Sequence, residues 1–213
     1  AEELFYAPVQ EYTKQLLAAV PHLGRHSASV NLTERDLAEI DARPAIVEAR
    51  GMRVTYPGRL GSPAFQAVRG VDLTIHEGEV FGLVGESGSG KTTIGRAMAG
   101  LEEVTGGSLK VLGLEMKGFK ERKFRPLRKD IGFVFQDPAT SFDPQQTIGD
   151  AISEPLDIHR PDMNAAARRA RVAELLEAVQ LPASYAARFP HELSGGQRQR
   201  ISFARALALN PKL

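Results

Sequence analysis

Apolar residues recur at the spacing of an amphipathic helix in several parts of the chain. Near the N-terminus this pattern predicts a helix within residues 1–23, and its stripe is Val9, Tyr12, Thr13, Leu16, Leu17 and Val20. The clearest long helix is expected over 162–181, with Asp162 or Asn164 as its cap and Pro182 as its stop. Its buried stripe is Val172, Leu175, Leu176 and Val179. A last helix is predicted from about Gly196 to Leu209.

Short apolar segments between the helices predict β-strands. Residues 46–56 and 71–75 alternate apolar and polar side chains, as half-exposed strands do. The segment 80–84 is continuously apolar, which suits a central strand covered on both faces, and 131–135 predicts another short strand. A helix is expected after Val84, with a left-handed cap at Gly100 near its end. Strands that alternate with helices indicate an α/β fold with a largely parallel sheet.

Composition narrows the class of protein. The 213 residues include 27 Lys and Arg against 26 Asp and Glu, so a formal net charge of +1 removes the whole-protein electrostatic argument for binding nucleic acid or a lipid surface. The absence of cysteine excludes disulfides and thiolate chemistry. No apolar run approaches the roughly 18–20 residues of a membrane-spanning helix. Residues 24–44 are polar and read as a linker, with a short helical turn possible at Leu37 and Ile40, so we place a domain boundary near Pro44.

A glycine-rich segment stands between the apolar segment 80–84 and the helix that follows it. Its residues, Gly85, Glu86, Ser87, Gly88, Ser89, Gly90, Lys91 and Thr92, match GxxxxGK[ST] in the strand–loop–helix setting that this motif requires. Glycines let consecutive N–H groups point at phosphate oxygens, and the helix N-terminus adds partial positive charge. We therefore expect Lys91 to neutralise nucleotide phosphates, Thr92 to complete a Mg²⁺ shell and Thr93 to lie in the same site. The alternative is a βα turn that binds nothing.

A second possible anion site stands at the start of the last helix. Leu193, Ser194, Gly195, Gly196 and Gln197 place hydroxyl and backbone donors at a helix N-terminus. On its own this segment could be a capped helix with flexible glycines. Together with the phosphate loop, it resembles the signature of the ABC ATPases. The resemblance implies an α/β P-loop NTPase core with an antiparallel β subdomain and a helical subdomain. It also implies a head-to-tail sandwich in which this signature acts on a nucleotide held by a second ABC module.

Two further residues take their expected roles from this resemblance. Gln136 follows the apolar segment 131–135 and matches the family's Q-loop, which implies that its amide coordinates Mg²⁺ or orients the attacking water. The alternative is an ordinary surface glutamine. Tyr56 ends the first predicted strand, at the position of the aromatic residue that stacks on adenine in the family. The alternative there is a tyrosine that only packs.

A basic cluster is the one feature that suggests nucleic acid. It comprises Lys117, Lys120, Arg122, Lys123, Arg125, Arg128 and Lys129. Because its only interleaved aromatics are Phe119 and Phe124, we interpret it as a solvated helical face and expect no nucleic-acid partner.

The segment from Phe135 to Asp150, continued by Glu154-Pro155-Leu156, is similar to the ATPases of oligopeptide and dipeptide importers. Residues 5–21 are similar to the segment that closes such a module. The resemblance implies a tandem protein with a module tail over 1–23, a linker over 24–44 and an ABC domain over 45–213, whose helical subdomain spans about 137–192. Asn210–Leu213 matches the start of the family's Walker B strand. The resemblance therefore implies that the magnesium-binding Asp of that strand, the catalytic Glu and the switch His lie beyond this chain. We expect that the chain alone does not hydrolyse ATP.

The implied function is an ATP- and Mg²⁺-dependent motor for import of peptides or similar small solutes. Its implied partners are membrane-spanning subunits, a second ABC module and, indirectly, an extracytoplasmic solute-binding protein. Its implied place is the cytoplasmic face of the inner membrane, as a peripheral protein. Two alternatives stay open: a soluble ABC ATPase of translation or DNA repair, and a non-catalytic nucleotide-binding fragment.

Overall fold

The computed structural model describes residues 34–58, 63–137 and 142–213. The chain divides into one unit that ends at Ala42 and a second unit, Arg43–Leu213, and each is described by itself. In the first unit α3 (Glu34–Asp41) is a short helix, which confirms the helical turn expected at Leu37 and Ile40. The helix expected within 1–23 lies outside the described residues.

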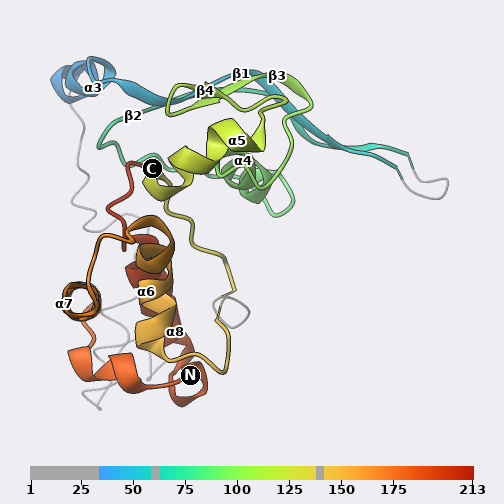
Figure 1. Ribbon diagram of the computed structural model, residues 1–213. Coiled ribbons are helices and arrows are strands. Elements are labelled where there is room, and N and C mark those ends of the chain that lie inside the picture. Colours follow the sequence, from blue (N-terminus) through green and yellow to red (C-terminus); the bar gives the residue numbers. More distant parts are fainter. Residues whose placement is uncertain (1–33, 59–62, 138–141) are drawn as a thin grey trace, which may run out of the picture. The chain divides into compact units, whose positions relative to one another are not determined.

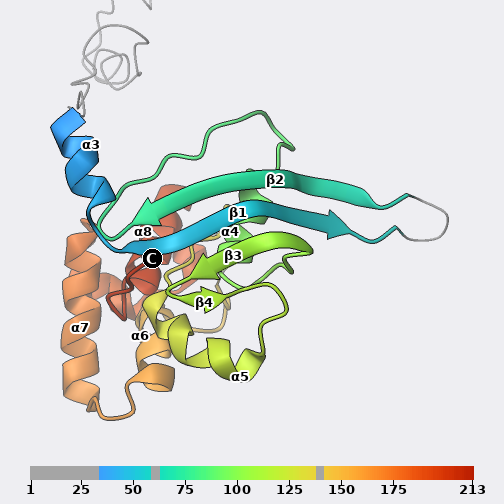
Figure 2. The same ribbon diagram turned by 90° about the horizontal axis from the view of Figure 1, so that it is seen from above.

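An antiparallel sheet opens the second unit. Its strands are β1 (Ala45–Tyr56), β2 (Phe65–His76), β3 (Gly106–Val111) and β4 (Leu114–Glu115), and they lie side by side in the order β2-β1-β3-β4 (Figure 2). The strands expected over 46–56 and 71–75 are confirmed, although the second begins earlier than expected, at Phe65. Antiparallel pairing suits alternating sequences, because one face is buried while the other meets water.

Two helices contribute to the apolar core of this sheet. They are α4 (Lys91–Met98) and α5 (Glu121–Phe124), and α5 continues as a 3₁₀ helix over Arg125–Asp130 (Figure 1). Ile94, Ala97 and Phe124 are buried in one cluster with Val47, Ala49, Met52, Val54, Leu109 and Val111 of the strands. Gly100 has φ +69°, which confirms the left-handed cap expected near the end of α4. A side chain there would meet the Phe124 ring at 2.5 Å, so this glycine also lets the ring pack closely.

The remaining helices lie together in the ribbon (Figure 1), and their buried side chains form a second apolar cluster. They are α6 (Ile148–His159), α7 (Ala165–Ala178) and α8 (Gly195–Ala206), with 3₁₀ helices at Ala183–Ala187 and Pro190–Glu192. The helices expected near 162–181 and 196–209 are confirmed, with shorter bounds. Asn164 caps α7 by accepting a hydrogen bond from the Ala167 N–H at 2.9 Å, which decides between the two expected caps. None of the described helices combines the length and apolar character needed to cross a membrane.

Two strand predictions are wrong for the described structure. Residues 80–84 and 131–135 form no strand, and the side chains of Val80 and Val84 are 99% and 94% exposed. A strand exists only where its N–H and C=O groups pair with a neighbouring strand, and the described sheet of β1 to β4 pairs with neither segment. The expectation of a largely parallel sheet is therefore also wrong for the residues described.

A short parallel contact involves the second of these segments. The Leu213 N–H donates to the Asp130 carbonyl at 3.1 Å, and the Gly132 N–H donates to the Leu213 carbonyl at 2.7 Å. This is the hydrogen-bond pattern of a parallel pair that places Leu213 beside Ile131.

The packing of Phe124 generates a stability prediction. In the full-length protein, Phe124→Ala should lower the free energy of unfolding by about 3–5 kcal/mol, because the fully buried ring leaves a cavity beside Gly100. Urea denaturation followed by circular dichroism measures this. The matched control is Phe65→Ala, whose ring is 57% exposed and which should change stability by less than about 1 kcal/mol. Equal losses for the two variants would contradict the packing described.

Candidate functional site

The glycine-rich segment forms a tight loop that leads into α4. Gly88 and Gly90 have φ values of +79° and +93°, a backbone region that residues with a Cβ rarely adopt. A Cβ at Gly90 would lie 2.5 Å from the Ala67 carbonyl oxygen of β2. Glycine at position 90 is therefore required both by the turn and by the close approach of the loop to β2.

The Lys91 ammonium lies inside this loop. It donates hydrogen bonds to the carbonyl oxygens of Gly85 at 2.8 Å and Glu86 at 2.6 Å, and a longer one to the Ser89 hydroxyl at 3.3 Å. The structure thus places three of the predicted phosphate-binding residues around the Lys91 cation, at the N-terminus of an eight-residue helix. Such a curled loop, with a positive charge and a helix N-terminus, has the donor set that fits a chain of phosphates.

The two expected Mg²⁺ ligands are placed on separate segments. Thr92 is exposed in the first turn of α4 beside Thr93, and Gln136 is exposed just after residues 131–135. In the described part of the chain no hydrogen bond joins Gln136 to Lys91 or Thr92, so the structure does not bring them together directly. The described residues also hold no group of three or more His, Cys, Asp or Glu side chains arranged as a metal site.

The segment Leu193–Gln197 begins α8 with a reciprocal cap. The Gln197 N–H donates to the Ser194 hydroxyl at 3.3 Å, and the Ser194 N–H donates to the Gln197 side-chain oxygen at 2.9 Å. Leu193 is buried and anchors this end of the helix in the second apolar cluster. The glycines are different: a Cβ at Gly195 or Gly196 would meet no atom within 4 Å. Within the described residues no packing contact requires glycine at these two positions, and both are exposed at this helix end.

Two aromatic residues lie at the end of the β1–β2 pair near the phosphate loop. Tyr56 and Phe65 are directly opposite each other in the register of these strands. Tyr56 is half-buried against the core of the sheet, whereas the Phe65 ring is 57% exposed. Phe65 lines a cavity of about 470 Å³ that also takes in Glu86, Ser87, Gly88 and Ser89 of the loop. Sequence reasoning missed Phe65, because only the strand register brings this residue to the loop.

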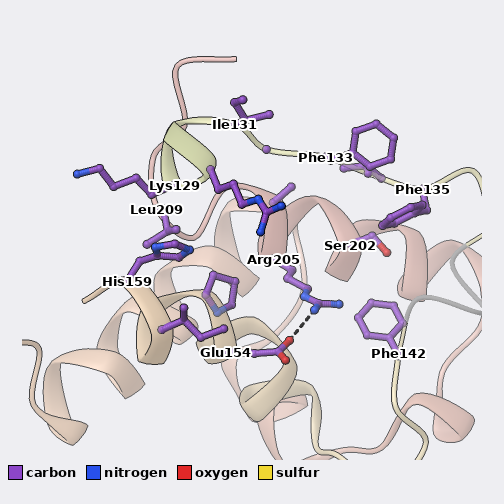
Figure 3. Close-up of a pocket in the computed structure, with 16 residues that line it drawn as sticks. Lys129, Ile131, Phe133, Phe135, Phe142, Glu154, His159, Ser202, Arg205 and Leu209 are labelled. Carbon is purple, nitrogen blue, oxygen red and sulfur yellow. Dashed lines mark hydrogen bonds and ion pairs between the residues drawn. The ribbon is translucent and has the colours of Figure 1, made fainter. Parts of the chain in front are cut away.

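A second cavity of about 330 Å³ lies between residues 131–135, α6 and α8 (Figure 3). Phe135, Phe142 and Ile158 supply apolar surface, and 65% of Ile158 is exposed. On its wall, Arg205 of α8 forms an ion pair with Glu154 of α6 at 2.5 Å (Figure 3). The cavity is therefore lined both by residues 131–135, which directly precede Gln136, and by α8, the helix that begins in the signature segment.

The basic cluster of residues 117–129 presents its seven cationic side chains to solvent. Its two aromatics face the other way. Phe124 is fully buried, and Phe119 packs against it with ring centroids 5.0 Å apart. Neither ring is therefore free to stack on a base.

Comparison with known proteins places these features in a family. A model of the ABC transporter family matches residues 68–213. The glutathione import ATP-binding protein GsiA of Escherichia coli (strain K12) is 43% identical over 235 residues, covering 100% of this chain and 37% of that protein. The same protein of Salmonella paratyphi A is 43% identical over 233 residues, with the same coverage. This chain therefore spans 37% of the length of these curated relatives.

Solved structures agree with the sequence matches. The dimeric ATP-binding cassette MJ0796, in a post-hydrolysis state bound to ADP and Pi, has a TM-score of 0.71 and 34% sequence identity. The alignment covers 78% of this chain and 70% of that one. A further dimeric structure of MJ0796, described as a bacterial ABC transporter cassette, matches equally well. With a phosphate loop at the start of α4, a capped signature at the start of α8 and these matches, the chain belongs to the ABC transporter family.

Proposed function

We propose that the protein that carries this chain binds and hydrolyses ATP to power import of peptides or similar small solutes through partner membrane subunits. The observation that carries the proposal is that one chain holds two helix N-termini suited to phosphate. At the start of α4 the glycine-rich loop surrounds the Lys91 ammonium, whereas the start of α8 is left open at Gly195 and Gly196. The relatives named for glutathione import support a small imported solute. The substrate itself is selected elsewhere, by membrane and solute-binding subunits.

The phosphate loop binds the nucleotide that this module holds. In the structure the charge of Lys91 is directed at the Gly85 and Glu86 carbonyls. Nucleotide phosphates offer that ammonium stronger, charged acceptors, and the loop N–H groups from Glu86 to Lys91 together with Thr93 supply further donors. Thr92 and Gln136 would hold Mg²⁺, which when bound neutralises phosphate charge. Gln136 also lies at the start of the segment that leads to the helical subdomain.

The signature acts on a nucleotide held by a second ABC module, either in the same polypeptide or in a dimer partner. Among the described residues, a Cβ added at Gly195 or Gly196 would meet no atom within 4 Å, so this helix end is suited to approach from outside. Leu193 and the Ser194–Gln197 cap hold that end rigid, so the donors are oriented before the partner arrives. The dimeric cassettes among the solved structures support this arrangement.

The cavity between residues 131–135, α6 and α8 is the surface that we propose for the membrane subunits. It borders the helical subdomain of about residues 137–192, and it combines exposed apolar side chains with the Glu154–Arg205 ion pair. A partner helix seated there would press on the segment of Gln136 and on α8 at once. This coupling would place the protein at the cytoplasmic face of the membrane, as a peripheral subunit.

Residues 1–23 would be the tail of a preceding module, 24–44 a linker, and 45–213 part of this ABC domain.

The first test concerns Lys91. Lys91→Ala in the full-length protein should lower ATP turnover roughly 100-fold or more, because the developing charge on the γ-phosphate loses its nearest cation. Phosphate release under steady-state conditions measures the change. Lys123→Ala removes an exposed lysine of α5 and serves as the matched control, with turnover unchanged. Retained turnover in Lys91→Ala would rule out this loop as the ATP site.

The second test concerns the open end of α8. Gly195→Asp should leave ATP affinity at the loop of Gly85–Thr92 nearly unchanged while it abolishes turnover, because a carboxylate then faces the γ-phosphate of the second module's nucleotide. Gly195→Ala is the matched control: its added Cβ meets no atom within 4 Å and brings no charge, so its effect should be much smaller. Equilibrium ATP binding and phosphate release are compared for both variants. A loss of affinity at the adjacent loop would count against action on a partner's nucleotide.

The third test concerns coupling to the membrane subunits. Glu154→Lys breaks the ion pair with Arg205 and reverses a charge on the cavity wall, so solute uptake by the assembled transporter should fall more than ATP turnover does. Glu177→Lys, an exposed glutamate of α7, is the charge-matched control and should leave both rates unchanged. Cysteine cross-linking from position 158 provides a second readout. Cross-links that never include a membrane subunit would contradict the assignment of this surface.

A further inference from the structure

The basic cluster of residues 117–129 concentrates positive charge that the chain as a whole does not show. It contains seven cationic side chains and one acidic side chain, Glu121, so its formal charge is +6, whereas the whole chain has a formal net charge of +1. In the described part of the chain, Arg128 forms an ion pair with Glu121 at 3.0 Å, and the other six cations have no ion-pair partner. Exposed cations that stand close together without counter-charges create a positive potential that attracts anions.

The apolar side chains of the same segment hold these cations on a firm base. The Phe124 ring is fully buried, Phe119 packs on it with ring centroids 5.0 Å apart, and Leu127 packs against the core of the sheet. The Arg128 guanidinium lies over the Phe124 ring, 5.6 Å from its centroid. The segment therefore turns its large apolar side chains inward and presents charge to solvent, which suits contact with an anionic surface without insertion into it.

The basic cluster borders the cavity between residues 131–135, α6 and α8. The 3₁₀ helix Arg125–Asp130 leads directly into residues 131–135, and both Arg128 and Lys129 line the cavity. Lys129 lies at its edge, with its ammonium directed away from Phe135 and Phe142 (Figure 3). Because we propose this cavity as the surface for the membrane subunits, docking there would bring the cluster toward the membrane as well.

The chemistry of the basic cluster favours a lipid surface over nucleic acid. Single-stranded nucleic acid is bound by aromatic rings on which bases stack, and neither Phe119 nor Phe124 is free to stack. Lysine and arginine side chains without fixed partners suit mobile lipid headgroups, which gather beneath them. Anionic lipids attract basic segments that lie beside membrane-spanning helices in this way.

We infer that the basic cluster of residues 117–129 is a second contact with the membrane, and that it binds the headgroups of anionic phospholipids beside the membrane subunits. This inference rests on the proposed function, because it takes the adjacent cavity as the surface for those subunits. The contact is made only at a membrane, so ATP turnover in solution, including that of Lys123→Ala, does not depend on it. Since the contact is electrostatic and exposed, added salt weakens it.

Vesicle flotation of the full-length protein tests this contact without the membrane subunits. Binding is measured to vesicles of phosphatidylcholine alone and to vesicles of equal parts phosphatidylcholine and phosphatidylglycerol, at low and at high salt. The test variant is Lys120→Gln/Arg122→Gln/Arg125→Gln. The matched control, Arg50→Gln/Arg169→Gln/Lys212→Gln, removes one lysine and two arginines that are exposed elsewhere on the chain. Thermal unfolding checks that each variant is folded, and a single-stranded oligonucleotide is the alternative ligand.

The unchanged protein should bind only the vesicles that contain phosphatidylglycerol, and less at high salt. The test variant should bind them about 100-fold more weakly, at roughly fivefold for each cation removed, and the control should lose much less. Unchanged vesicle binding by the folded test variant, or no binding by the unchanged protein, overturns this inference alone. Binding to the oligonucleotide but not to vesicles would make the cluster a nucleic-acid surface instead. Normal ATP turnover in Lys91→Ala would refute the proposed function, whatever the vesicles show.

Discussion

The partial positive charge at the N-terminus of a helix is the physical feature on which the proposed function depends. The first turn of a helix leaves N–H groups without intrahelical partners, so each such end attracts an anion. At α4 the glycine loop and Lys91 surround that end, and at α8 Ser194 and Gln197 cap it while Gly195 and Gly196 stay open. In the proposed function, the first end encloses phosphate and the second is approached from outside.

Each of these helix ends is positioned by a different apolar cluster. Ile94 and Ala97 bury α4 with the strands of the antiparallel sheet, whereas Leu193, Ile201 and Ala204 bury α8 with α6 and α7. The Glu154–Arg205 pair joins α6 to α8 on the cavity wall. This ion pair is only partly buried, so solvent screens it and its contribution to stability is small; its position between α6 and α8 matters more. A helix group with its own core can shift as a unit while the phosphate loop keeps its geometry.

The same requirement for paired backbone groups explains where strand prediction succeeded and where it failed. β1 and β2 pair with each other from Ala45–His76 to Tyr56–Phe65, and their alternating segments 46–56 and 71–75 were predicted as strands, although residues 65–70 of β2 were not. Residues 80–84 are apolar enough for a buried strand, yet in the described structure they pair with no strand, and the valines at both ends are almost fully exposed. Apolar character alone does not make a strand, because its hydrogen bonds must come from a neighbour that may be distant in sequence.

Local sequence was enough to predict the glycine-rich loop before α4, the start of α8, the cap at Gly100 and the alternation of β1, because each depends on residues within a few positions of one another. It also carried the family resemblance that the comparisons bear out.

Tertiary structure alone decided the rest. It buried Tyr56 against the sheet and exposed Phe65 beside the loop, it placed Glu154 against Arg205 across 51 positions, and it brought Gly90 onto the Ala67 carbonyl. These contacts follow from strand register and helix packing, which are set by the burial of the whole core and cannot be read from any one segment.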